Sequence, residues 1–143
     1  MINNVSELFE RDLKDFIDIL ESMESYSINS LEKIKSKLYT EEEISDTFMY
    51  ILKQTNTLTF ILISMIKTAS QYRPTNIALQ SFLNHLGSYI SHITSRSTDA
   101  LGKYRKNSIY SIRSIYRALE DIIHYTKAIK AELNDAIERS LFM

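Results

Sequence analysis

Residues that reverse the chain direction are scarce in this sequence. Its 143 residues include two glycines, one proline, no cysteine and no tryptophan, whereas average usage would supply about ten glycines and about seven prolines. Because tight turns depend on glycine and proline, a fold of many short strands and hairpins is excluded. The absence of cysteine also excludes disulfides, thiolate zinc sites and cysteine nucleophiles.

Long hydrophobic runs are also missing. The longest one extends from Leu58 to Ile66, which is far shorter than the ~20 residues that a membrane-spanning helix needs. The N-terminal stretch MINNVSELFERDLKDF is amphipathic and acidic and does not resemble a signal peptide. Together with the lack of cysteine, these features predict a cytoplasmic protein that does not enter a membrane.

Apolar residues at helical spacing dominate the chain. We therefore expect an all-α fold, an antiparallel bundle of four to five long helices that forms a single domain over residues 1–143. Four faces repeat in steps of three and four: Phe9, Leu13, Phe16, Leu20, Met23; Ile44, Phe48, Ile51, Thr55, Leu58, Leu62, Met65, Ala69; Leu79, Phe82, Leu86, Tyr89 or Ile90, Ile93; and Ile112, Ile115, Leu119, Ile122, Thr126, Ile129, Leu133, Ala136.

Polar and capping residues mark the expected ends of the helices. The first segment covers residues 4–39, with Asn4 as its cap, and is one helix or two because its middle is polar; its apolar spacing resumes at Leu31, Ile34 and Leu38. Thr40 can cap the second helix, with Glu43 reaching back. Within that helix, the run from Leu58 to Ile66 is expected to be nearly fully buried. Arg73-Pro74 ends the second helix, and a third begins near Thr75.

The stretch from Thr94 to Asp99 contains only polar residues and predicts the third connection. The last helix then starts near Asp99, with Ser97 or Thr98 as its cap, and is the longest in the chain. A helix of forty residues would reach about 60 Å, against about 33 Å for its neighbour. Such a long C-terminal helix bends, is covered by a split first helix, or packs on another copy, which makes a homo-oligomer one of the expected outcomes.

Charge is divided along the chain, although the net charge is only −1. Residues 1–46 carry twelve acidic and five basic side chains, and residues 120–143 carry five acidic and three basic ones. Residues 47–119 carry nine basic side chains and a single acid, Asp99. The molecule is therefore strongly dipolar, which favours contact with charged partners.

A basic stripe with interleaved tyrosine follows the last predicted helix. It comprises Lys103, Lys106, Tyr110, Arg113, Arg117, Glu120, His124 and Lys127, in steps of three and four. Arginine, lysine and tyrosine on one helix face can contact phosphates and stack on bases, so RNA or DNA is one predicted partner and an acidic protein is another. In a second interpretation, the arginines pair with Asp12, Asp15, Asp18 or Glu21 of the first helix.

The segment Arg117-Ala118-Leu119-Glu120-Asp121-Ile122-Ile123-His124 resembles the HEPN family of RNA-cleaving domains. That family places arginine four to six residues before histidine in a small helical domain, and the two cut RNA across a dimer without a metal. The resemblance implies Arg117 and His124 as catalytic residues. The chain departs from the family at Ala118, where Asn, Asp or His is usual.

The segment His124-Tyr125-Thr126-Lys127-Ala128 is similar to the His-x-x-Lys-Gly signature of histidine phosphotransfer domains. This similarity implies His124 as a phosphate acceptor. Ala128 replaces the glycine of that signature, and only nineteen residues follow the histidine, whereas the family continues with another long helix.

Residues for metal or cofactor chemistry are lacking. His85 and His92 share a helix face with Tyr89, but seven residues separate them by about 10.5 Å, too far for one ion. Gly87 and Gly102 cannot form a glycine-rich phosphate loop. We therefore expect no cofactor, no metal and no small-molecule substrate. The sequence favours a self-associating binding or adaptor subunit without enzymatic activity, with the HEPN-like ribonuclease as the main alternative.

Overall fold

A computed structural model describes residues 5–105 and 109–143, and it describes side chains over residues 7–102 and 112–143. It contains four helices: α1 (Val5–Lys35), α2 (Glu41–Tyr72), α3 (Ile77–Arg105) and α4 (Ile109–Glu138). The described ranges contain no strand. The predicted all-α bundle is confirmed, with four helices.

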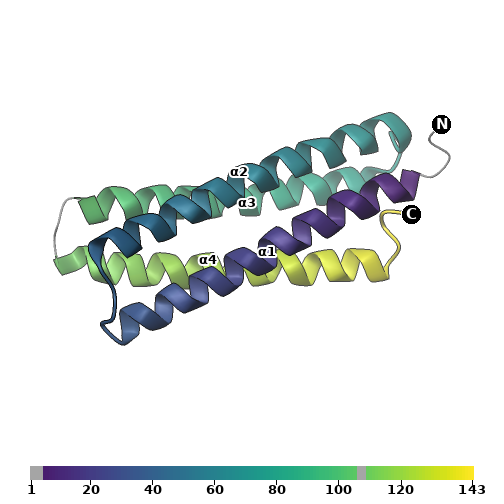
Figure 1. Cartoon of the computed structure of the whole chain (residues 1–143). Helices are drawn as coiled ribbons and strands as arrows, with labels where there is room; N and C mark the ends of the chain where they lie inside the picture. Colours follow the sequence, from purple (N-terminus) through teal and green to yellow (C-terminus); the bar gives the residue numbers. More distant parts are fainter. Residues whose placement is uncertain (1–4, 106–108) are drawn as a thin grey trace.

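The helices run antiparallel and form a square (Figure 1). Contacts join α1 to α2, α2 to α3, α3 to α4 and α1 to α4, while the diagonal helix pairs stay apart in the described part of the chain. The start of α1 and the end of the chain lie at the same end of the bundle (Figure 1). There the ring of Phe142 packs against Phe9, with 5.5 Å between centroids, and against Phe82, at 5.9 Å.

The core consists of the four predicted seams. All predicted apolar positions of the first face, residues 9–23, are buried. The same holds for the whole predicted face of α2 and for the face of α4 from Ile115 onward. On α3 the buried seam includes Leu83, while Phe82 and Tyr89 are half-buried at its edge. Such regular three-four spacing is typical of helices that pack at a small crossing angle.

The first segment is one continuous helix. Ser27 is fully buried and continues the seam from Met23 through the polar middle of α1. The helix ends at Lys35, and Lys37 adopts a positive φ of 58°. Leu38 lies beyond this end and is 73% exposed, so its predicted place in the core is wrong.

The caps around the two described connections satisfy backbone groups at the helix ends. The N–H of Glu43 donates to the Thr40 side chain at 3.1 Å, as predicted, but the Glu43 carboxylate accepts from Lys33 instead of reaching back. Asn76 caps α3 by accepting from the N–H of Leu79 at 3.0 Å. The predicted cap Asn4 lies outside the described residues.

The predicted connection from Thr94 to Asp99 is wrong, because α3 passes through it and ends at Arg105. Ser97 within this stretch and Ala100 just after it are buried and continue the seam of α3, and the Thr94 hydroxyl donates to the Ile90 carbonyl within the helix. As a result α4 is not the longest helix: the four helices have 31, 32, 29 and 30 residues. The overhanging C-terminal helix that suggested dimerisation does not exist.

The prediction that residues Leu58 to Ile66 are nearly fully buried is also wrong. Leu58, Leu62 and Met65 lie in the core, but Phe60 is 67% exposed and Ile63 is 43% exposed. The outward face of α2 therefore carries large apolar side chains. None of the described helices is long and apolar enough to cross a membrane.

Candidate binding surfaces

The predicted basic stripe is divided between two helices. Lys103 belongs to α3, whereas Arg113, Arg117 and Lys127 are exposed on α4. Lys106 lies outside the described residues, and so do the side chains of Lys103 and Tyr110. The part of the stripe on α4 lies on one helix face. The prediction that the stripe continues along a single helix from residue 103 is wrong.

Among the described side chains, the arginines of the stripe do not pair with Asp12, Asp15, Asp18 or Glu21 of α1. The antiparallel arrangement places the start of α4 beside the end of α1, where the Lys35 ammonium lies 5.8 Å from the centroid of the Tyr116 ring. The ion pair that joins α1 to α4 among the described side chains is Lys130–Glu24, at 3.2 Å. Over those side chains, Arg113 and Arg117 form no ion pair within 4 Å, so both guanidinium groups remain available to a partner.

Arg117 and His124 lie on one exposed face of α4, two turns apart, which corresponds to about 10.5 Å of rise. The His124 ring packs edge-on against Tyr125, with 5.8 Å between centroids. Neither residue contacts the other within one chain. HEPN-like chemistry would therefore require a second chain, as the resemblance itself implies.

Histidines and tyrosines form a cluster between α3 and α4. Rings of Tyr89 and His92 pack on Tyr125 at 5.9 and 5.4 Å, and the His92 ring is nearly parallel to it. Glu132 accepts from the Tyr89 hydroxyl at 3.4 Å and lies 3.3 Å from the His85 ring nitrogen. The sequence shows only the α3 half of this cluster, because Tyr125 and Glu132 come from a different helix.

Burial and the Glu132 carboxylate both raise the pKa of Tyr89 above its ordinary value of 10.0. The phenol therefore stays protonated at neutral pH and serves as a hydrogen-bond donor. No group of three metal-ligating side chains exists among the described residues. This cluster links α3 to α4 and shows no reactive group.

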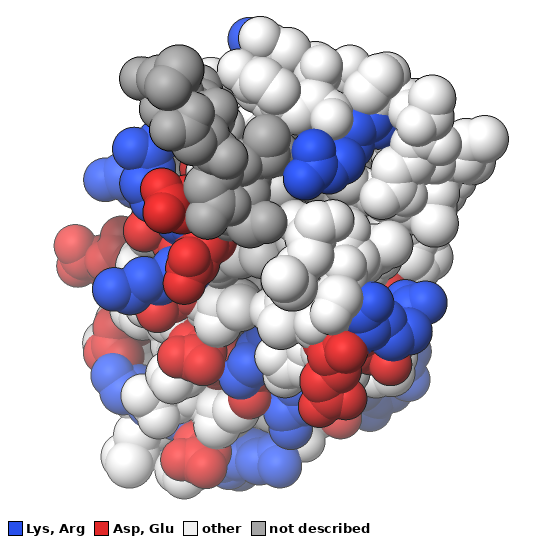
Figure 2. Space-filling model, turned by 90° about the vertical axis from the view of Figure 1, so that its right-hand side faces the viewer, with Lys and Arg blue, Asp and Glu red and all other residues white. Residues whose placement is uncertain are grey.

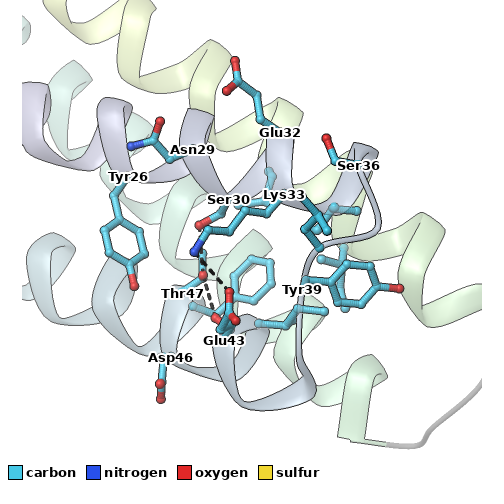
Figure 3. A pocket seen from close by; sticks show the side chains of 16 residues that line it. Tyr26, Asn29, Ser30, Glu32, Lys33, Ser36, Tyr39, Glu43, Asp46 and Thr47 are labelled. Carbon is cyan, nitrogen blue, oxygen red and sulfur yellow. Dashed lines mark hydrogen bonds and ion pairs between the residues drawn. The ribbon is translucent and has the colours of Figure 1, made fainter.

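A pocket of about 500 Å³ lies between the end of α1 and the start of α2 (Figure 3). Its floor includes Phe48 and Leu119, and its rim is polar. The polar rim groups pair with one another across the two helices: Lys33 with Glu43 at 3.2 Å and Ser30 with Thr47 at 3.0 Å. These pairs fasten α1 to α2, whereas Asn29, Glu32 and Asp46 on the rim take no part in them (Figure 3).

Between residues 47 and 98 the outward surface of α2 and α3 carries no carboxylate, because this range contains neither Asp nor Glu. We name the outward surface of residues 47–72 and 77–98 the acid-free face. Its exposed members include Met49, Lys53, Asn56, Phe60, Ile63 and Lys67 on α2, and Ile77, Ser81, Asn84, Ser88, Ser91 and Ser95 on α3. In the end-on view of Figure 2, acidic side chains gather toward the lower and left parts, whereas the upper right part is white with a few blue side chains.

Two adjoining grooves run along the acid-free face between α2 and α3. One has a volume of about 690 Å³ and lies beside Met49 and Asn56, and the other, of about 520 Å³, lies beside Gly87 and Ser91. Thr59 and Thr94 line both grooves, so together they form one depression along the seam. A surface with exposed apolar side chains, no carboxylate and a central groove is a surface to which another protein can bind.

Comparisons with protein-family models, with curated proteins and with solved structures find no match to this chain.

Proposed function

We propose that this four-helix bundle acts by binding and not by catalysis, as a self-associating adaptor subunit whose contact surface is the acid-free face. One observation carries the proposal. Met49, Phe60 and Ile63 are 53%, 67% and 43% exposed on the same side of α2, on a surface without any carboxylate. Scattered apolar side chains are normal on a protein surface, but a group of them on one face is typical of a contact site.

The core does not require these three side chains. Successive turns of α2 already bury nine residues against the other helices. The outward side of a helix in a bundle is ordinarily polar, and here α2 places phenylalanine and isoleucine there. Covering them in an interface would remove apolar surface from water, which favours association.

The oligomeric state of the purified chain tests this function. We expect light scattering to show association of the wild type at micromolar concentration, and Phe60→Glu to weaken it about thirtyfold or more, the effect of removing an interface hot spot. Circular dichroism of Phe60→Glu should match the wild type, since residue 60 lies outside the core.

Ile137→Glu is the matched control. Ile137 is 44% exposed on α4, away from the acid-free face, so this variant should associate like the wild type. A wild-type chain that remains monomeric at hundreds of micromolar would contradict self-association. Equal weakening by both variants would show that any added negative charge prevents it.

The exposed cations of α4 support a second contact surface, for phosphate groups of RNA or DNA. Arg113, Arg117 and Lys127 are exposed and have no ion-pair partner among the described side chains. Since they lie on α4, a nucleic acid could bind while the acid-free face is occupied. A helix face of unpaired cations is the usual electrostatic basis of nonspecific nucleic-acid binding.

Fluorescence anisotropy with a single-stranded RNA oligonucleotide tests this surface. We expect the affinity to fall with salt, and the variant with all three residues changed to glutamine to lose about 2 units of the log–log salt slope, about 0.7 for each phosphate contact. The double variant Lys53→Gln and Lys67→Gln, on α2 diagonally opposite α4, should leave the slope unchanged. Salt-independent binding would contradict phosphate contact.

The integrity of the RNA in the same samples tests the alternative function, a ribonuclease. Intact RNA after incubation supports a binding role. Cleavage that disappears in both Arg117→Ala and His124→Ala would instead make the HEPN-like activity the function of the chain.

A further inference from the structure

We infer that the acid-free face binds the acid-free face of a second copy of this chain, with α2 of each copy lying on α3 of the other. This inference rests on the proposed self-association and specifies its geometry. The two copies would be related by a two-fold axis parallel to the helices, so that the same patch is used twice. Four features of the acid-free face support this inference: its area, its exposed apolar residues, the different sizes of the side chains on α2 and α3, and its lack of carboxylates.

The face is large enough for a stable dimer. The face covers residues 47–72 of α2 and 77–98 of α3, so it is about 35 Å long, and two adjacent helices present a strip about 20 Å wide. Such a strip offers about 700 Å² per copy. Stable protein interfaces bury about 600–1,000 Å² on each side.

The apolar side chains and the groove are arranged in a self-complementary way. In the middle of the face the large apolar residues Phe60 and Ile63 lie on α2, while the facing part of α3 carries Ser88, Ser91 and Ser95, and the groove between them passes Gly87 and Ser91. The exposed Ile77 lies at the start of α3, away from this middle part. When α2 of one copy lies over α3 of the other, Phe60 and Ile63 face small side chains and the groove instead of facing each other. Large residues opposite small ones allow two helices to interdigitate.

Contacts within one copy define which residues would meet. The methyl group of Leu62 lies 3.5 Å from the position of a Cβ on Gly87, so residue 62 of α2 is level with residue 87 of α3. Thr59 lines the same groove as Ser91 and Ser95. Because the two-fold axis parallel to the helices preserves these levels, Phe60 would meet the partner copy near Ser91, and Asn56 would meet it near Ser95.

Charge favours this pairing over the other symmetric one. If α2 lay antiparallel on α2 of the second copy, with Phe60 at the centre, Lys53 would lie opposite Lys67 of that copy and repel it. With α2 on α3, Lys67 would lie level with Ser81 and Asn84 of the other copy, and Lys53 level with Ser95 and Arg96. The Arg96 guanidinium is already paired with Asp99 and Asp121. Since the face has no carboxylate, two copies can approach without placing an acid against an acid.

Cysteine cross-linking tests the geometry, and the chain suits the method because it has no native cysteine. Asn56→Cys and Ser95→Cys alter exposed positions beside the groove and spare the apolar residues. We expect mild oxidation of an equimolar mixture of the two variants to give a disulfide-linked dimer, since a disulfide requires Cα atoms within about 7 Å. Each variant oxidised alone should give little disulfide-linked dimer.

Ser25→Cys, at an exposed position on α1, is the matched control in mixtures with either variant. The expected yield of the Asn56–Ser95 pair is at least about tenfold above these mixtures, because the dimer raises the local thiol concentration. The singly substituted chains should retain the wild-type oligomeric state by light scattering.

Each other outcome overturns a defined part of the inference. Efficient cross-linking of Asn56→Cys with itself would place α2 against α2 and overturn this geometry. Dimers by light scattering without any cross-link on α2 or α3 would place the interface elsewhere, while the proposed self-association stands. A monomer would overturn both, and a monomer that binds vesicles of anionic phospholipid would assign the acid-free face to a lipid surface.

Discussion

Replacing Phe48 by alanine is expected to lower the free energy of unfolding by about 3–5 kcal/mol. The side chain is fully buried in the core of α2, where its ring fills space between helices. Its removal loses the free energy of burying an aromatic ring and leaves a cavity that the long helices cannot close, since their backbones are fixed by packing on both sides. Urea denaturation followed by circular dichroism measures the change.

Phe60→Ala is the matched control for this experiment, because it is the same substitution in the same helix. Phe60 is 67% exposed, so we expect less than about 1 kcal/mol at a protein concentration that keeps the chain monomeric. Equal losses for the two variants would contradict the burial pattern of α2. A greater loss for Phe60→Ala would place residue 60 in the core, and the acid-free face would not exist as described.

Thr98→Pro is expected to lower the free energy of unfolding by about 3 kcal/mol or more. Thr98 lies in the interior of α3 and is exposed, so the substitution removes no packed side chain. Proline removes the N–H that bonds one turn back in the helix, and its ring clashes with that carbonyl. The experiment therefore distinguishes a continuous α3 from the connection that the polar residues suggested.

Glu41→Pro shows what a tolerated proline does in the same bundle. Glu41 is the first residue of α2, and Thr40 before it is extended, with φ −111° and ψ 162°, which suits the residue preceding a proline. We expect a loss within about 1 kcal/mol, from the missing negative charge at the helix start. If Thr98→Pro were equally mild, residues 94–99 would form a connection after all.

The core was predictable from apolar spacing because the period of a helix determines which residues point inward. The seam from Ile44 to Ala69 is buried at every predicted position. The ends of α2 at Thr40 and Arg73-Pro74 were predictable from single residues, because a capping side chain and a proline act on the backbone directly. No tertiary contact is needed to predict these two ends.

The third connection could not be predicted from polarity alone. Residues 94–99 lack apolar side chains, but they contain neither glycine nor proline, and Arg96 forms an ion pair with Asp121 of α4 at 2.9 Å. Tertiary contacts of this kind hold a polar segment in helical form although its own propensity is modest. The mistaken connection made α4 appear too long, and this apparent excess length was the reason for expecting α4 to pack on another copy.

The candidate surfaces were predictable only in part. The absence of acids from residues 47–98 is visible in the sequence, but the run from Leu58 to Ile66 is so apolar that its outward residues cannot be separated from its inward ones by composition. The exposure of Phe60 depends on how α2 is rotated toward its neighbours. The same holds for Glu132, which meets His85 and Tyr89 only because α3 and α4 have a particular register.

The square arrangement of the four helices has a consequence for folding speed. Three of its four seams join helices that follow each other in the chain, and only the seam between α1 and α4, with the Phe9–Phe142 contact at its end, closes a long loop. Chains whose contacts are mostly local fold in microseconds to milliseconds, because little loop entropy is lost before the contacts form. From the order of the helices we expect a rapidly folding chain in which the seam that closes the longest loop, between α1 and α4, forms last.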